Sequence, residues 1–166
     1  MNLVKRTLLI ASVLSACVGC DQVTKNITRQ SLSNSKPIAF LNDTFRLQYA
    51  ENPGAFLSLG AGSPESIRFW AFTLIVGVFL AGMLVYLLVS SNNSKAKIVS
   101  LSLVLGGGVG NLIDRIFNEG RVFDFMNIGI GSLRSGVFNV ADIAISFGVV
   151  WFIAISFKAS KEKPAL

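Results

Sequence analysis

The stretch GGGVGNLIDR, Gly106 to Arg115, ends an apolar segment and closes on an acid beside a base. A second acid, Asp142, stands near the start of another apolar segment, in FNVADIAISFGVVWF from Phe138 to Phe152. Ionisable groups inside a membrane are costly and are usually functional. These two stretches therefore decide both the expected fold class and the expected site.

The composition of the chain is that of a membrane protein. Of its 166 residues 52% are hydrophobic and only 14% are charged, and a soluble surface needs more polar residues than this. Four apolar segments predict a membrane all-α four-helix transmembrane bundle with spans at about 6–22, 68–90, 97–114 and 139–158. We find no linker or internal repeat, so residues 1–166 are expected to form a single integral membrane domain.

The basic residues predict the orientation of the bundle. Seven of the fifteen Lys and Arg residues flank the spans at the N-terminus, between the second and third spans, and after the fourth. By the positive-inside rule, both termini are cytoplasmic. The net charge of +6 is then a topology signal, and no nucleic-acid partner is expected because aromatic residues are not interleaved with these bases.

Two outer segments, 23–67 and 115–138, connect the spans. In the first, TFRLQYA at 44–50 alternates apolar and polar residues, the period of a half-exposed strand, although a solvated loop remains an alternative. In the second, RVFDFMNIGIG at 121–131 is typical of strand and turn. Together they predict a small β-sheet on the outer (periplasmic) face.

Three acids are predicted to lie at one depth in the membrane. Asp21, Asp114 and Asp142 are 15, 17 and 16 residues from the nearest base at the cytoplasmic boundary. At about 1.5 Å per residue, each is roughly 22 to 26 Å from that boundary, close to the outer face. If the third and fourth helices are neighbours, Asp114 and Asp142 can meet.

A pair of carboxylates that shares one proton can hydrolyse a peptide without a metal or a nucleophilic side chain. The ionised member takes a proton from water, and the protonated member donates one to the carbonyl oxygen or the leaving amine. The chain contains no histidine, which excludes Ser-His and Cys-His nucleophiles. Helix ends favour Asp142 as the base and Asp114 as the acid.

Structural interpretations of these acids stay open at the level of sequence. Asp142 is also placed to cap its helix together with Asn139, three residues earlier, and Asp114 is placed for an ion pair with Arg115. The glycines of GGGVG remove side chains from one helix near Asp114, which suits either close helix packing or the approach of a substrate backbone.

At these residues the chain resembles the bacterial lipoprotein signal peptidases, the type II signal peptidases, over nearly its full length. GNLIDR and the later FNVAD carry the resemblance, which implies Asp114 and Asp142 as the catalytic aspartates. It also implies that this aspartic endopeptidase removes signal peptides from prolipoproteins by cutting just before the diacylglyceryl-modified cysteine. The resemblance further implies substrate-binding or supporting roles for Asp21 and Lys25 in DQVTK, Asn52 and Gly54 in NPGAFLS, and Asn111, Arg115, Asp124 and Asn139.

Two features depart from or complicate the resemblance. Phe56 and Leu57 stand where the family's outer-loop motif has alanine and phenylalanine, which puts in doubt only how that loop contacts the substrate. Leu14-Ser15-Ala16-Cys17 has the form of a lipoprotein cleavage box. The first helix is nevertheless expected to be retained, because Asp21 and Lys25 follow it directly.

Two other functions compete with the peptidase. One is a small proton-coupled membrane transporter, whose acids would be expected nearer the midplane, and the other is a structural protein lipidated at Cys17. On the peptidase interpretation we expect no cofactor or metal, a monomer in the bacterial inner membrane, and an active site near the periplasmic face. The expected partners are diacylglyceryl-modified prolipoprotein signal peptides and membrane lipids.

Overall fold

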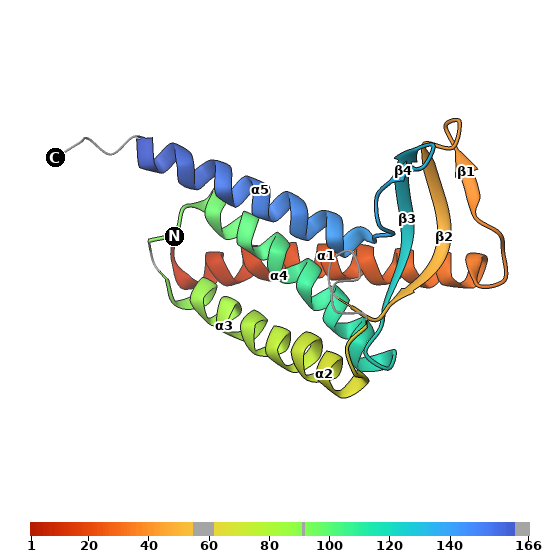
Figure 1. The fold of residues 1–166 in the computed structure, drawn as a ribbon. Helices are drawn as coiled ribbons and strands as arrows, with labels where there is room; N and C mark the ends of the chain where they lie inside the picture. The colour runs from red at the N-terminus through yellow and green to blue at the C-terminus, as the bar shows by residue number, and fades with distance from the viewer. Residues whose placement is uncertain (55–61, 91, 162–166) are drawn as a thin grey trace.

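The computed structural model describes residues 1–54, 62–90 and 92–161. Four helices are long and apolar enough to cross a membrane, as predicted: Leu3–Leu32, Ser66–Val89, Lys95–Phe117 and Val140–Lys158. They run side by side, and the sheet stands across one end of the bundle (Figure 1). The helical elements are α1 (Leu3–Leu32), α2 (Glu65–Phe69), the π-helix η2 (Trp70–Ile75), α3 (Val76–Val89), α4 (Lys95–Phe117) and α5 (Val140–Lys161).

The sheet confirms the strands predicted in the two outer segments. Its order is β1 (Ile38–Phe40), β2 (Phe45–Asn52), β3 (Val122–Ile130) and β4 (Leu133–Arg134), and every neighbouring pair is antiparallel. β2 and β3 come from different outer segments, and their register shifts between Leu47 and Ala50. The sheet therefore ties the two segments together above the helices.

Helix α1 is longer than the predicted first span, which ended near residue 22. It continues to Leu32 because the polar residues after Lys25 include no glycine or proline, and the first proline comes only at Pro37. Its final turns pass beside the sheet (Figure 1). Buried Leu32 packs there with Phe123 and Phe125 of β3.

The glycines before Asp114 are used for packing between helices of this chain. A β-carbon on Gly106 would come within 2.7 Å of the Cys17 β-carbon in α1, and one on Gly107 would clash with the carbonyl oxygen of Ala141 in α5. α4 can therefore lie close to both helices, and these two positions are filled by the protein itself. This supports the packing interpretation of GGGVG at these two positions.

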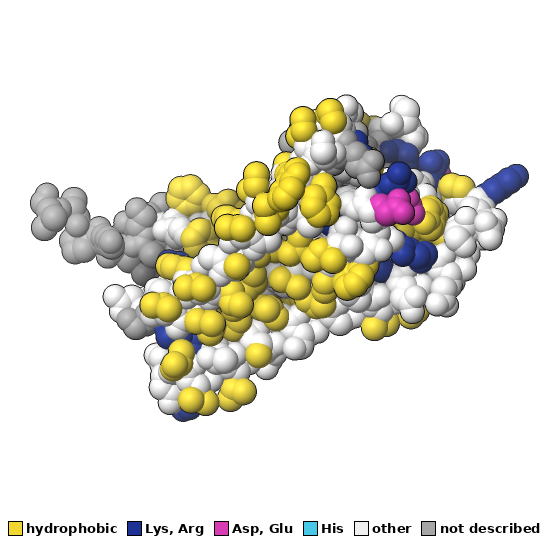
Figure 2. All heavy atoms as spheres, turned by 90° about the horizontal axis from the view of Figure 1, so that it is seen from below, with side chains coloured by type: hydrophobic (Ala, Val, Ile, Leu, Met, Phe, Trp, Pro, Cys, Tyr) yellow, Lys and Arg dark blue, Asp and Glu magenta, His cyan; other side chains and the backbone are white. Residues whose placement is uncertain are grey.

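The outer surface of the bundle is apolar. Exposed side chains such as Val78 and Phe79 of α3 and Phe147 and Val150 of α5 are 60 to 66% exposed. Figure 2 shows hydrophobic side chains spread over the visible face of the helices, while charged side chains gather toward the ends. Such a surface requires lipid rather than water around it.

Candidate active site

The helices approach the sheet at one end of the bundle (Figure 1), and polar side chains from five elements meet in this region. All ten residues predicted from the sequence belong to one hydrogen-bonded network in this region. They are Asp21 and Lys25 of α1, Asn52 and Gly54 at the end of β2, Asn111, Asp114 and Arg115 of α4, Asp124 of β3, and Asn139 and Asp142 at the start of α5.

Asp114 is held by donors on both of its carboxylate oxygens. The Nζ of Lys25 lies 2.9 Å from Oδ2, and the backbone N–H of Phe123 donates to the same oxygen at 3.0 Å. Gln22 donates to Oδ1 at 3.0 Å. Lys25, rather than Arg115, is thus the ion-pair partner of Asp114, and both carboxylate oxygens of Asp114 already accept hydrogen bonds from the protein.

Asp142 occupies the capping position predicted for it and also contacts α4. Its Oδ2 accepts the Asn139 backbone N–H at 3.1 Å, and its own N–H donates to Oδ1 of Asn139 at 3.0 Å. This reciprocal pair is a capping box at the start of α5. Its other oxygen, Oδ1, accepts a hydrogen bond from Nδ2 of Asn111 at 2.9 Å. Asp142 therefore caps α5 and belongs to the polar site at the same time.

Asp124 lies on β3 beside Asp142, with Asn139 between them. Nδ2 of Asn139 donates to Oδ1 of Asp124 at 2.6 Å, and Nδ2 of Asn52 donates to Oδ2 at 3.2 Å. The side chain is 2% exposed. Burial, followed by the negative charge of Asp142, raises the pKa of Asp124 from its ordinary 3.8 to about 7.

Of the three acids Asp114, Asp124 and Asp142, only two line the cavity of about 490 Å³ at this end of the bundle. Asp124 and Asp142 both line it, together with Asn52, Asn111 and Arg115. Asp114 instead lines a smaller polar hollow of about 230 Å³ with Lys25 and Gln22 of α1. The carboxyl groups that share the larger cavity are therefore those of Asp124 and Asp142. The depths of the acids in the membrane had instead predicted a pair of Asp114 and Asp142.

The remaining predicted residues fix the walls of this site. Asp21 is fully buried, and its Oδ1 accepts the backbone N–H of Ala141 at 2.9 Å. Arg115 donates to the carbonyl oxygen of Gly54 at 2.9 Å, and the Gly54 N–H donates to Oδ1 of Asn52 at 2.9 Å. Arg115 and Asn52 therefore hold the backbone that follows β2. Phe56 and Leu57 lie outside the described residues.

Sequence reasoning missed two donors in the network, Gln22 and the backbone of Phe123. Gln22 bridges α1 to α4, since its side chain also donates to the carbonyl oxygen of Gly110 at 3.2 Å. Its position next to Asp21 in DQVTK was an available signal. The Phe123 amide carried no signal, because its role depends on how β3 lies beside α4.

No group of metal ligands is found within the described part of the chain, where three or more Asp, Glu or Cys side chains do not converge. Cys17 is half-buried and packs on α4 near Gly106, and Cys20 is exposed. Neither cysteine belongs to the polar network.

Comparison with known proteins identifies the family. The family model described as Signal peptidase (SPase) II matches residues 13–158. A lipoprotein signal peptidase of Leifsonia xyli subsp. xyli is 36% identical over 157 residues, covering 91% of this chain and 68% of the relative. One of Hydrogenovibrio crunogenus is 38% identical over 150 residues, covering 87% and 84%.

The fold has a counterpart among solved structures. A bacterial membrane enzyme solved by the in meso method at 2.3 Å superposes with a TM-score of 0.75 at 24% identity, covering 98% of this chain and 93% of the other. This likeness establishes the fold alone. With a family match over most of its length and relatives above 30% identity, the chain belongs to the signal peptidase II family.

Proposed function

We propose that this protein removes signal peptides from prolipoproteins, cutting just before the diacylglyceryl-modified cysteine, as an aspartic endopeptidase of the bacterial inner membrane. The single observation that carries the mechanism is the cavity lined by Asp124 and Asp142. Family membership supports the class of substrate. The apolar helices around the site suit a substrate that is itself embedded in the membrane.

In the proposed reaction, Asp142 is the base and Asp124 is the acid. Asp142 stands in the first turn of α5, where the helix dipole and the N–H of Asn139 favour a negative charge. Asp124 carries a proton near neutral pH because its pKa is about 7. Water loses a proton to Asp142 and adds to the peptide carbonyl. Asp124 donates its proton to the carbonyl oxygen, which gives a tetrahedral gem-diol. The C–N bond then breaks as Asp142 passes the proton it took from water to the leaving amine and Asp124 takes a proton back from the gem-diol, so the products are a carboxylic acid and an amine.

The catalytic assignment of Asp114 thereby changes from the one expected from sequence. With both oxygens occupied and Lys25 at 2.9 Å, Asp114 is better suited to hold Lys25 than to exchange protons with water. Lys25 in turn donates to Oδ1 of Asn111 at 3.0 Å, and Asn111 donates to Asp142. Asp114 therefore positions the base through two intervening side chains.

The proposed topology follows from the basic segments. Both termini and the loop around residue 94 lie in the cytoplasm, and the sheet and the site lie at the periplasmic face. This places Asp142 within reach of water from the periplasm while its helix remains in lipid.

The test is cleavage of a lipidated model precursor by the purified protein. We expect a single cut before the modified cysteine, and no cut in a matched precursor that lacks the diacylglyceryl group. Asp142→Asn serves as the inactive control. Equal cleavage of the unmodified precursor would show that the lipid is not recognised, and no cleavage of either would exclude the peptidase function.

A further inference from the structure

A second hollow opens between the helices, toward the other end of the bundle from the candidate site. It has a volume of about 460 Å³ and is bounded by α3, α4 and α5. In the bundle, α4 lies between the other two helices (Figure 1). It lies near the end of the bundle that holds the N-terminus, which we call the basic end. It is lined by Phe79, Gly82 and Tyr86 of α3, Lys97 and Leu101 of α4, and Phe152 of α5.

The hollow combines an apolar floor with one cation. The Nζ of Lys97 lies 5.6 Å from the centre of the Tyr86 ring and 5.8 Å from that of Phe152. Within the described part of the chain, no carboxylate forms an ion pair with Lys97. The ammonium group thus lies against Tyr86 and Phe152, and no acid of the described residues neutralises its charge.

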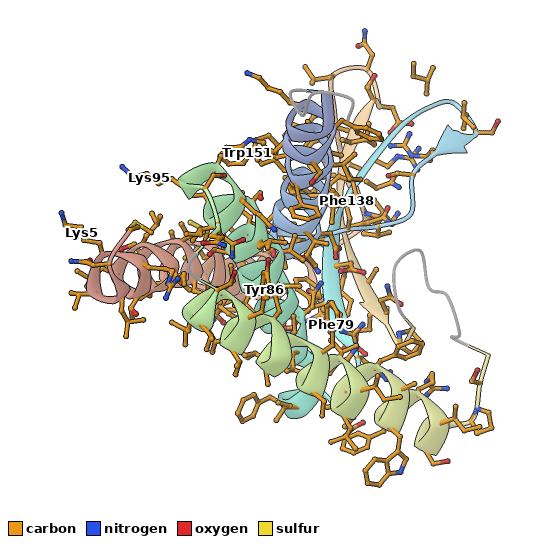
Figure 3. All side chains as sticks on the ribbon, turned by 90° about the vertical axis from the view of Figure 1, so that its left-hand side faces the viewer. Lys5, Phe79, Tyr86, Lys95, Phe138 and Trp151 are labelled. Atoms are coloured by element: carbon orange, nitrogen blue, oxygen red, sulfur yellow. The ribbon has the colours of Figure 1, made fainter. Side chains whose placement is uncertain are left out.

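The surroundings of Lys97 are also basic. Lys5, Lys95 and Lys158 lie at the same end of the bundle, and Glu162 is the one acid in the three flanking segments 1–10, 90–97 and 158–166. Figure 3 looks onto this end, with Lys5 and Lys95 at its edge and Tyr86 and Phe79 on α3. Arg6 is already engaged, because its guanidinium donates to the carbonyl oxygens of Leu88 and Ser90. Lys97 is therefore the base that lines the hollow, and further basic residues lie at the same end of the bundle.

Space for an apolar chain is present beside this charge. A β-carbon on Gly82 would meet no atom within 4 Å, so glycine at this position leaves open room where other residues would place a side chain. Phe79 is 61% exposed and Tyr86 is 43% exposed, so the wall of the hollow faces the lipid phase. A ligand for this place needs an acyl chain and an anionic head.

We propose that the hollow between α3 and α5 binds a phospholipid with an anionic headgroup, drawn from the cytoplasmic leaflet. The phosphate contacts Lys97, and one acyl chain lies over Gly82 toward Phe79. Basic pockets between membrane helices on the cytoplasmic side are suited to such headgroups. A signal peptide is a poorer occupant at this end, because its own basic start would meet Lys97 and Lys95. The inference rests on the proposed topology but not on the peptidase activity.

The test measures lipid retention by native mass spectrometry of the purified full chain. The protein is equilibrated with equal amounts of phosphatidylglycerol and phosphatidylcholine, in the absence of substrate. We expect phosphatidylglycerol to be retained preferentially by the wild type. Lys97→Gln is expected to lower its retention about fivefold, because one lysine near an anionic lipid contributes about 1 kcal/mol. Lys97→Arg is expected to keep the preference.

Two further variants separate this site from general basicity. Gly82→Leu fills the hollow without a change in charge and is expected to reduce retention of phosphatidylglycerol as strongly as Lys97→Gln. Lys158→Gln removes an exposed charge at the same end, outside the hollow, and is expected to have little effect. Equal binding of both lipids by the wild type would overturn the proposal. So would an unchanged preference in Lys97→Gln and Gly82→Leu, or an equal loss in Lys158→Gln. Because no substrate is present, loss of peptidase activity does not affect the result.

Discussion

Asp114→Asn and Asp124→Asn are expected to change stability in opposite directions, although each substitution removes one carboxylate from the same network. Asp114 neutralises buried Lys25, which is 4% exposed. Asp124 is a buried acid beside Asp142, and among the described residues no cation forms an ion pair with it. The pair of variants therefore tests the proposed structural role of Asp114 against the proposed catalytic role of Asp124.

The magnitude for Asp124→Asn follows from its pKa. The pKa is about 7 in the folded protein against 3.8 for the ordinary group. This difference of about three pH units corresponds to at most about 4 kcal/mol at about 1.36 kcal/mol each. We expect about half of this free energy to appear as a gain in stability. The rest is offset because the amide side chain of the variant would offer only one oxygen to the two donors Asn139 and Asn52. Asp124→Asn should therefore raise the stability at pH 8 by about 2 kcal/mol.

The pH dependence has a definite sign. Because the folded-state pKa of Asp124 is raised, its contribution to stability is fully present below pH 3.8 and is lost as the pH rises through about 7. The gap in melting temperature between Asp124→Asn and the wild type should therefore widen from pH 5 to pH 8. A gap of about 2 kcal/mol corresponds to about 4 to 8 °C in a chain of this size.

Asp114→Asn should destabilise the protein. Breaking a buried ion pair costs about 3 to 5 kcal/mol, but Lys25 keeps Asp21 at 2.8 Å, so we expect about 2 to 3 kcal/mol. Turnover should fall about 10 to 100-fold through lost orientation of Asn111 and Asp142, whereas Asp124→Asn should abolish it. Asp43→Asn, at an acid of the β1–β2 turn that is paired with Arg46, is the matched control for activity.

The assay combines thermal unfolding in detergent with cleavage of a lipidated precursor. If Asp114→Asn kept its melting temperature but lost all turnover, while Asp124→Asn remained active, the catalytic pair would be Asp114 and Asp142 after all. A lower melting temperature for Asp124→Asn than for the wild type would mean that the fold stabilises ionised Asp124, which would contradict its proposed role as the acid.

Four further outcomes are expected. Asn139→Ala should lower turnover about 10 to 100-fold, since it removes the cap of Asp142 and a donor to Asp124; normal initial rates would refute this. A chelator should leave cleavage unchanged, and recovery of a chelated, inactive sample by a divalent ion would contradict the direct use of carboxylates. In a pH-rate profile, turnover should fall above about pH 7 as Asp124 loses its proton, and a flat profile to pH 9 would exclude it as the acid. Gly107→Val should separate α4 from α5 because of its contact with Ala141, measured as a lower melting temperature.

The sequence was sufficient to predict the helical bundle, the two main strands and the membership of the polar network. Apolar segments of membrane length and alternation in TFRLQYA are local signals, and they do not depend on how the elements pack. The length of α1 was underestimated, because the end of an apolar segment was taken as the end of the helix. Helix formation needs no apolar residues, and the polar turns up to Leu32 are supported by packing on β3.

The proposed pairing of Asp124 with Asp142 could not be reached from the depth of the acids in the membrane. Counting residues places an acid along the membrane normal but says nothing of the direction in which its side chain points. Asn111 and Asp114 differ by three residues, or about 60° around α4. This is enough for Asn111 to reach Asp142 while Asp114 contacts α1. The position of Asp124 depends on β3 crossing the end of the bundle, which only the packed structure defines.

The hydrogen bond from the Ala141 amide to Asp21 joins the first membrane helix to the last one, and this has a consequence for biosynthesis. The ribosome releases α5 last, so a nascent chain with three inserted helices still lacks Asp142. Asp21 and Lys25 meanwhile lack part of their polar surroundings, which is unfavourable in lipid. Arrival of α5 relieves that cost and completes the proposed catalytic pair in the same event. Cys17, with the cleavage-like box before it, packs against Gly106 of α4, so this contact between the first and third membrane helices can form before α5 arrives.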